Sequence, residues 1–174
     1  MGRTANRGQA RAEAGLARPR CADRDCRARQ RQLEAAARLM FLLDTNIVSE
    51  LRKPKPHGGV VAWISAQDAS SLYLCAMTIA ELQRGVEMTR ERDGEKAAQI
   101  EAWLEQLTVT GQVLAMDAAV CRAWAKLMHR RSATLVEDAF IAATASVHRL
   151  VVVTRNVRDF KTLGVDTLNP FERS

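Results

Sequence analysis

The sequence has little of what marks several specialised classes of protein. Its 174 residues contain no apolar run approaching the ~20 residues that cross a bilayer, so we expect no membrane span and no membrane partner. A basic start without an apolar segment behind it argues against a secretory signal and predicts a cytoplasmic protein. The four cysteines, at positions 21, 26, 75 and 121, fit neither a disulfide framework nor zinc-finger spacing.

Sequence motifs of several common activities are also absent. There is no GxGxxG, no GxxxxGK[ST], no GxSxG and no HExxH, which argues against dinucleotide binding, P-loop chemistry and the usual hydrolase nucleophile turn. The three histidines follow no metal-ligand spacing. Aromatic residues make up 5% of the chain, with a single Tyr, so the sequence predicts no surface for stacking bases.

The positive charge of the chain is confined to its first 39 residues. The formal net charge is +6, and residues 1–39 hold ten Arg against four acidic residues. Residues 40–174 therefore carry 16 basic and 16 acidic side chains and have no net charge. The high isoelectric point does not indicate a basic nucleic-acid-binding domain, because it belongs to the first segment alone.

Composition divides the chain into an extension, residues 1–39, and a domain, residues 40–174. The extension has no Val, Ile, Phe, Tyr or Trp and too few Leu to build a core, so we expect it to be disordered. An Arg-rich arm that grips RNA is one alternative. Another is that translation starts at Met40, which directly precedes the first apolar run.

Apolar runs alternate with helical periodicity throughout the domain. Strands are expected at residues 40–43, 72–76, 113–116 and 150–153, with a short fifth at 166–168. Helices are expected at residues 47–52, 60–67, 78–88, 95–108, 118–129 and 134–149. This alternation predicts an α/β fold of three layers, α/β/α, with a mostly parallel sheet of four to five strands.

Polar side chains follow the predicted strands at the edge where ligands bind in such folds. Asp44 comes directly after the first strand, Glu81 early in the helix after the second, and Asp138 early in the helix before the fourth. Asn156 follows the fourth strand, with Asp159 three residues on. Three carboxylates converging on one cleft repel one another unless a cation neutralises them, and oxygen-only ligands suit Mg²⁺ or Mn²⁺.

Each of these residues also has an ordinary structural explanation. Asp44 can cap the next helix, and Asp138 can complement a helix dipole. Thr78-x-x-Glu81 and Thr134-x-x-Glu137 both match a capping box, which we take as the role of Glu137.

Four sequence blocks follow one another in the domain. They are residues 42–50 (LLDTNIVSE), 78–82 (TIAEL), 137–145 (EDAFIAATA) and 153–160 (VTRNVRDF), and residues 169–171 (NPF) close the series. In this order they resemble PIN domains, especially the VapC and FitB-like toxins of bacterial toxin–antitoxin pairs. Residues 1–39 have no counterpart in that resemblance.

The resemblance implies a PIN-like fold and a metal-dependent endoribonuclease, a phosphodiester hydrolase that cleaves single-stranded regions of RNA. Asp44, Glu81 and Asp138 correspond to the acidic trio around Mg²⁺ (or Mn²⁺), with Asp44 and Asp138 as direct ligands and Glu81 binding directly or through water. Asn156 stands at the fourth acidic position as a further catalytic residue, and Asp159 is the candidate to supply the carboxylate missing there.

Substrate contacts and partners follow from the same resemblance. Thr154, Arg155 and Arg158 are the expected contacts to RNA phosphates. The expected partner is a VapB- or FitA-like antitoxin that blocks the cleft and carries the complex to promoter DNA. The nuclease itself is expected to be a homodimer, and a heterotetramer or larger assembly with the antitoxin.

Other functions of an acidic α/β cleft stay open from the residues alone. They are an acidic metal phosphoesterase without RNase activity, such as a haloacid-dehalogenase-type phosphatase, a flap-type DNA nuclease, and a PIN-like binding module. The phosphatase chemistry usually needs a second Asp where this chain has Asn46. Cleavage assays on single-stranded RNA, duplex DNA and a phosphatase substrate, run side by side with Mg²⁺, distinguish these functions.

Overall fold

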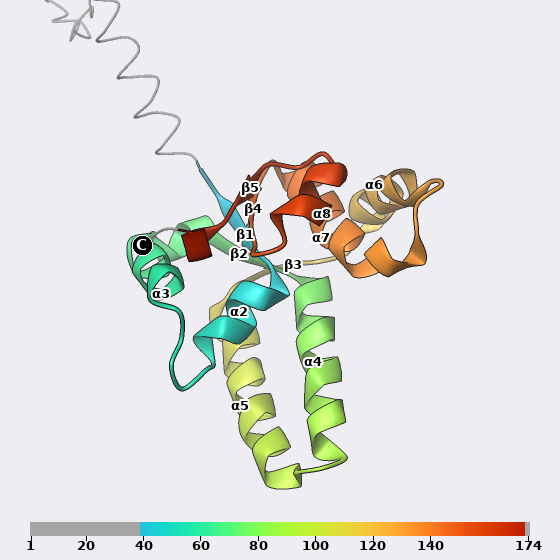
Figure 1. The fold of residues 1–174 in the computed structure, drawn as a ribbon. Coiled ribbons are helices and arrows are strands. Elements are labelled where there is room, and N and C mark those ends of the chain that lie inside the picture. The colour runs from blue at the N-terminus through green and yellow to red at the C-terminus, as the bar shows by residue number, and fades with distance from the viewer. Residues whose placement is uncertain (1–38, 173–174) are drawn as a thin grey trace, which may run out of the picture. The chain divides into compact units, whose positions relative to one another are not determined.

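The structure is a computed structural model that describes residues 39–172 (Figure 1). The expectations for the Arg-rich extension therefore concern residues that lie, apart from Leu39, outside the described range. No helix within the described range is long and apolar enough to cross a membrane.

The centre of the domain is a sheet of five strands. They are β1 (Phe41–Leu43), β2 (Leu72–Cys75), β3 (Gln112–Leu114), β4 (Val151–Val153) and β5 (Thr167–Leu168). Their order across the sheet is β3-β2-β1-β4-β5, and every neighbouring pair is parallel. The predicted parallel sheet is thus confirmed, including its short fifth strand.

Helices cover both faces of the sheet. One set contains α2 (Thr45–Leu51), α3 (Gly58–Ser65), α4 (Ala76–Arg90) and α5 (Gly94–Thr110), of which α4 and α5 form a long hairpin (Figure 1). The other set contains α6 (Ala118–Met128), α7 (Val136–His148) and α8 (Val157–Thr162). Three short 3₁₀ turns complete the described chain: η1 (Ala69–Ser71), η2 (Ala133–Leu135) and η3 (Pro170–Glu172).

Successive side chains of β1 point into two separate hydrophobic cores, one on each face of the sheet. Leu42 packs with Ile141 of α7 and Phe160 of α8, whereas Leu43 packs with Ile47 of α2 and Trp63 of α3. Successive side chains of a strand point to opposite faces, so a strand buried on both faces must be apolar throughout. The unbroken apolar run of β1 therefore produces the predicted three layers.

The strand order reverses direction at β1. The chain passes from β1 to β2 on one side and later returns through β4 on the other side of β1. The carboxyl ends of β1 and β4 flank the point of reversal, where open α/β sheets leave a crevice. The loops that follow β1 and β4 are therefore the ones expected to form a binding site.

Two predicted capping boxes are absent from the described structure. The cap of α4 is Cys75, whose sulfur accepts from the Met77 N–H, while the Thr78 hydroxyl is buried and donates to the carbonyl of Leu43. The cap residue of α7 is Leu135, without a side-chain bond. The predicted capping role of Glu137 is therefore wrong, because an extra 3₁₀ turn, η2, moves the helix start past Thr134.

Candidate active site

Asp44 and Thr154 meet at the carboxyl ends of β1 and β4. The backbone N–H of Asp44 donates to the carbonyl of Val153 at 3.0 Å, which extends the β1–β4 pairing by one residue. Each residue is thus the first after its strand. The sheet register brings their side chains together although 110 positions separate them.

The carboxylate of Asp44 is held by hydrogen bonds on both oxygens. Oδ1 accepts from the Thr45 backbone N–H at 2.7 Å, which makes Asp44 the cap of α2 as predicted. Oδ2 accepts from the Thr154 hydroxyl at 2.6 Å and from the side-chain amide of Asn46. Asp44 is only 4% exposed. Capping of α2 explains the bond to Oδ1, whereas the two bonds to Oδ2 have no part in capping.

Glu81 joins this group through Thr45. The Thr45 hydroxyl donates to Glu81 Oε2 at 2.6 Å, which links the first turn of α2 to α4. Glu81 lies in the second turn of α4 rather than the first, because the helix begins at Ala76. At this position on α4, the Glu81 side chain lies on the side of the helix that faces α2 and Asp44.

A second pair of carboxylates lies on α7 and α8. Asp138 is in the first turn of α7, and Asp159 is in the first turn of α8. The side-chain amide of Asn156 donates to Asp138 Oδ2 at 3.2 Å and to Asp159 Oδ2 at 2.8 Å. Asn156 therefore bridges the two carboxylates, and Asp159 faces the site instead of turning away from it.

The carboxylates interact electrostatically across the two pairs. Burial raises the pKa of Asp44 to about 6, with smaller contributions from Asp138 and Glu81. Burial also raises the pKa of Asp138 to about 6, and repulsion from Asp159 and Glu81 adds to it. Negative charge is thus concentrated at Asp44, which is buried, and at Asp138, which is half-buried. A bound cation would reduce both the repulsion between the carboxylates and the free-energy cost of burying their charge.

The donor set fits a hard divalent cation that keeps part of its water shell. In residues 39–172 no group of three or more His, Cys, Asp or Glu side chains is close enough to form a metal cage by itself. Mg²⁺ is commonly held by one or two carboxylates together with water and substrate phosphate. Two separated pairs of oxygen donors suit this coordination of Mg²⁺ better than they suit zinc, which prefers tetrahedral sets of nitrogen and sulfur ligands.

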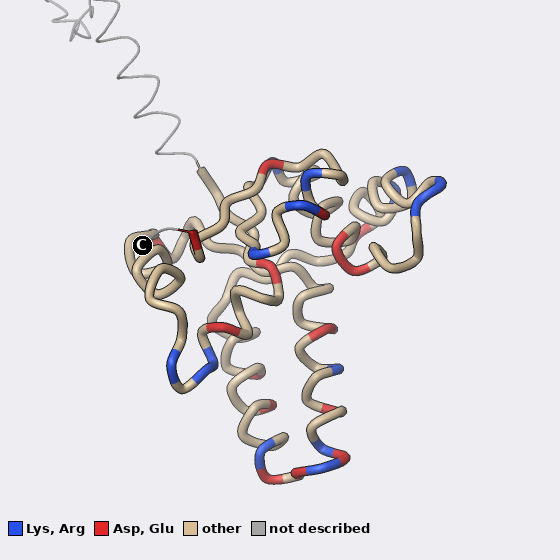
Figure 2. Tube along the Cα trace, viewed as in Figure 1, with Lys and Arg blue, Asp and Glu red and all other residues tan. Residues whose placement is uncertain are grey.

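The three predicted substrate contacts have different exposures. Thr154 is fully buried, so it has no surface for a phosphate and instead orients Asp44, contrary to its predicted role. Arg155 and Arg158 are exposed on the loop and helix that follow β4. Charge elsewhere in the described chain is mixed, with both signs at the tip of the α4–α5 hairpin (Figure 2).

Two residues that hold the site were missed in the sequence. Thr45 fixes Glu81, and Asn46 bonds Asp44 and Thr154 and also accepts the Arg155 backbone N–H at 3.1 Å. In the sequence, Asn46 is noted only as standing where phosphatase chemistry usually needs a second Asp. The available signal was position, since polar residues directly after a capping Asp lie at the same sheet edge.

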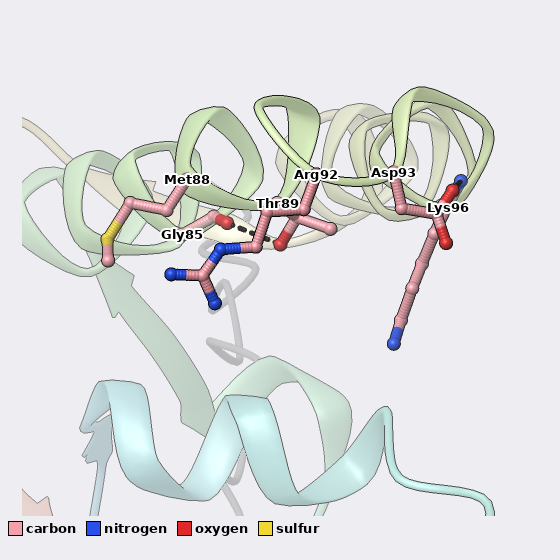
Figure 3. A pocket seen from close by; sticks show the side chains of 6 residues that line it. All are labelled: Gly85, Met88, Thr89, Arg92, Asp93 and Lys96. Atoms are coloured by element: carbon pink, nitrogen blue, oxygen red, sulfur yellow. Dashed lines mark hydrogen bonds between the residues drawn. The ribbon is translucent and has the colours of Figure 1, made fainter.

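A surface hollow of about 430 Å³ on the α4–α5 hairpin is separate from these carboxylates (Figure 3). Its only acidic lining residue, Asp93, caps α5 by accepting from the Lys96 N–H at 2.9 Å. The full lining is Gly85, Met88, Thr89, Arg92, Asp93 and Lys96. The acidic chemistry thus lies at the sheet edge and not in this hollow.

Comparison with known proteins gives related sequences over most of the domain. The family model described as PIN domain matches residues 41–165. VapC ribonuclease Y4jK of Sinorhizobium fredii is 38% identical over 140 residues, which cover 76% of this chain and 99% of the relative. Toxin FitB of Neisseria gonorrhoeae is 36% identical over 141 residues, with the same two coverages.

Solved structures with the same arrangement also match. FitAcB from Neisseria gonorrhoeae superimposes with a TM-score of 0.68 at 33% identity, covering 76% of this chain and 99% of that one. A structure of FitAB bound to an IR36 DNA fragment gives a TM-score of 0.67 at 32% identity, covering 78% and 98%. The predicted three-layer fold is confirmed.

Proposed function

This chain belongs to the PIN domain family, and we propose that it is a Mg²⁺-dependent endoribonuclease acting as the toxin of a VapBC- or FitAB-like toxin–antitoxin pair. One observation carries the proposal. Four carboxylates, Asp44, Glu81, Asp138 and Asp159, gather in two bridged pairs at the point where the strand order reverses.

Asp44 and Asp138 are the proposed direct ligands of Mg²⁺, with Glu81 and Asp159 holding its water. When bound, the ion would acidify a water and neutralise charge at the scissile phosphate. The chain's own contribution is to fix the ligands before binding, since Asp44 is held from three directions and Asn156 spaces Asp138 from Asp159.

Glu81 is proposed to orient the attacking water for in-line displacement at a phosphodiester. Its Oε2 is anchored by the Thr45 hydroxyl, which fixes the direction of the other carboxylate oxygen. Arg155 and Arg158 are proposed to hold neighbouring phosphates, because arginine supplies much of the affinity for a nucleic-acid backbone. Asn156 serves as the bridge that keeps the second carboxylate pair in place.

A comparative cleavage assay tests the function. Purified protein is incubated with single-stranded RNA, duplex DNA and a phosphatase substrate, with Mg²⁺ or with a chelator. Internal cleavage of RNA alone, abolished by chelation and by Asp44→Asn, supports the proposal. Hydrolysis of the phosphatase substrate, or no Mg²⁺-dependent hydrolysis by well-folded protein, supports the phosphoesterase or binding-module alternatives instead.

An antitoxin is the proposed partner, and the acidic site explains how it would inhibit. A basic antitoxin side chain, such as Arg, would satisfy the same carboxylates that attract the metal. Promoter DNA would be bound through the antitoxin. Inhibition by the cognate antitoxin, titrated with and without Mg²⁺, should weaken as Mg²⁺ rises, and inhibition that tightens with Mg²⁺ would contradict this competition.

Residues 40–174 are proposed to form the whole nuclease domain. The described helices and strands, and all the proposed site residues, lie within that range. Protein spanning Met40–Ser174 should therefore melt and cleave RNA like the full chain. A large loss of either would assign residues 1–39 to the domain or to RNA capture.

A further inference from the structure

The closing NPF block of the sequence has no role in the site described so far. Pro170 and Phe171 lie in η3, which packs against α3, and Phe171 packs against the hydrophobic core that includes residues of β1 and β4. The Phe171 ring also contacts two side chains outside that core. The guanidinium carbon of Arg155 lies 5.2 Å from the ring centroid, and the His57 ring lies 5.1 Å away.

Arg155 stands in the chain between the residues that hold the two carboxylate pairs. Thr154, before it, donates to Asp44, and Asn156, after it, donates to Asp138. The backbone of Arg155 is therefore fixed at the mouth of the acidic site. Its basic side chain thus extends from a position between the two carboxylate pairs.

A guanidinium so placed would be expected to fold back onto a carboxylate. Within residues 39–172, however, Arg155 makes no ion pair with Asp or Glu, and its guanidinium lies against Phe171. Cation–π attraction favours this arrangement. Because Arg155 is exposed, its N–H groups stay available to an anion that approaches from solvent.

Phe171 is itself held in place by its own segment. Asn169 accepts from the Phe171 N–H at 3.0 Å and donates to Glu172 at 2.9 Å, while Pro170 is buried. The turn fixes the ring before any ligand arrives. A fixed ring can define the position of a long flexible side chain that lies on it.

We propose that Phe171 is a positioning residue, which keeps the Arg155 guanidinium off the carboxylates and presents it to a backbone phosphate of the RNA beside the cleaved bond. This inference rests on the proposed nuclease function and adds the C-terminal segment to the substrate site. It makes Phe171 a determinant of RNA affinity rather than of the chemical step.

The test measures RNA affinity and cleavage separately. A fluorescent single-stranded RNA oligonucleotide is titrated in metal-free buffer over a salt series, and steady-state cleavage of RNA is followed with Mg²⁺. The variants are Arg155→Ala, Phe171→Leu, Phe171→Trp and the double variant Arg155→Ala/Phe171→Leu. Arg92→Ala, at the far turn of the α4–α5 hairpin, is the matched control for the loss of one positive charge (Figure 3).

Removing Arg155 should raise Kd and KM about three- to ten-fold with little change in kcat, and should lower the salt slope of binding by about 0.7, the value for one phosphate contact on a single strand. Phe171→Leu should reproduce most of that loss, and Phe171→Trp should retain near wild-type values. The double variant should bind no more weakly than Arg155→Ala alone, and Arg92→Ala should match wild type.

Wild-type affinity and KM in Phe171→Leu, beside a loss in Arg155→Ala, would overturn the positioning role. An unchanged salt slope in Arg155→Ala would overturn the phosphate contact. If Phe171→Leu melts at a lower temperature, the double variant still tests the positioning role. Only that role predicts that Phe171→Leu weakens RNA binding when Arg155 is present and has no further effect when Arg155 is absent. Wild-type cleavage in the same assay separates these outcomes from failure of the nuclease proposal itself.

Discussion

The two carboxylate pairs of the site are built in different ways. Asp44 is buried, accepts from three donors and belongs to a loop between two core elements. Asp138 is half-buried, and its side chain accepts only from Asn156 among the described residues. Both have a pKa raised to about 6, but for Asp138 repulsion from its neighbouring carboxylates ranks directly after burial.

This difference separates a preorganised half of the site from an open half. Hydrogen bonds to a carboxylate favour its charged form and fix its direction, so the Asp44 half is ready to bind a cation. The Asp138 half lies on two helices, α7 and α8, and has the freer access to solvent and substrate. We expect mutations in the first half to disturb geometry, and mutations in the second half to disturb charge.

The largest effect is expected for Asp44→Asn. The change removes a proposed direct ligand and puts an amide N–H₂ next to two donors, so cleavage of RNA should fall by at least about 100-fold. Added Mg²⁺ should no longer raise the melting temperature of the variant. Wild-type cleavage by a well-folded Asp44→Asn protein would contradict the metal role of the preorganised half.

Asp138→Asn should also lower cleavage strongly but should stabilise the metal-free protein. The pKa of Asp138 is raised to about 6 in the folded metal-free protein, so Asp138 binds a proton more tightly there than in the unfolded chain. Protonated Asp138 therefore stabilises the fold fully below about pH 4. This contribution is lost as the pH rises through about 6. Near pH 7 the substitution should add about 1 kcal/mol, after allowance for the solvent exposure of Asp138.

Melting curves in EDTA at pH 4.5 and pH 7 read out this effect for wild type and Asp138→Asn. The variant should melt about 2–4 °C higher than wild type at pH 7, with a smaller difference at pH 4.5. Mg²⁺ should narrow the gap by stabilising the wild type more. A variant that melts lower than wild type at pH 7 would show that Asp138 mainly complements the helix dipole of α7.

Thr154→Val tests the preorganisation of Asp44 without removing a carboxylate. The Thr154 hydroxyl lowers the pKa of Asp44, so its loss should raise that pKa and shift the acidic limb of the pH–rate profile upward. Cleavage at neutral pH should fall about ten-fold, as is typical for groups that orient metal ligands. Thr154→Ser, which keeps the hydroxyl, is the control and should follow the wild-type profile.

The sequence alone predicted the fold and the carboxylates better than the contacts between them. Apolar runs such as Leu42-Leu43 report burial directly, and Asp44 and Asp138 stand out because strand ends in a parallel sheet converge. Whether Asp159 faces the site depends on the rotation of α8, a six-residue helix that is not among the helices expected from the sequence. The role of Thr154 depends on β1–β4 register, and that of Phe171 on tertiary packing, neither of which local patterns encode.

The smallest effect is expected for Glu137→Gln, next to Asp138 on α7. Glu137 does not cap the helix, and its carboxylate pairs with Arg84 of α4 at 3.4 Å on the surface. Exposed pairs of this kind contribute about 0–1 kcal/mol, so the melting temperature should change by no more than a few degrees. Cleavage should stay near wild type, and the pH dependence of metal-free stability should persist, because Asp138 is intact.

Arg84→Gln should give the same small change, and the double variant should add nothing further if the pair is the whole interaction. A loss of activity in Glu137→Gln comparable to that of Asp138→Asn would mean that negative charge anywhere on the first turn of α7 serves the site, and the distinction between the two halves would then lie in the helix rather than in one carboxylate.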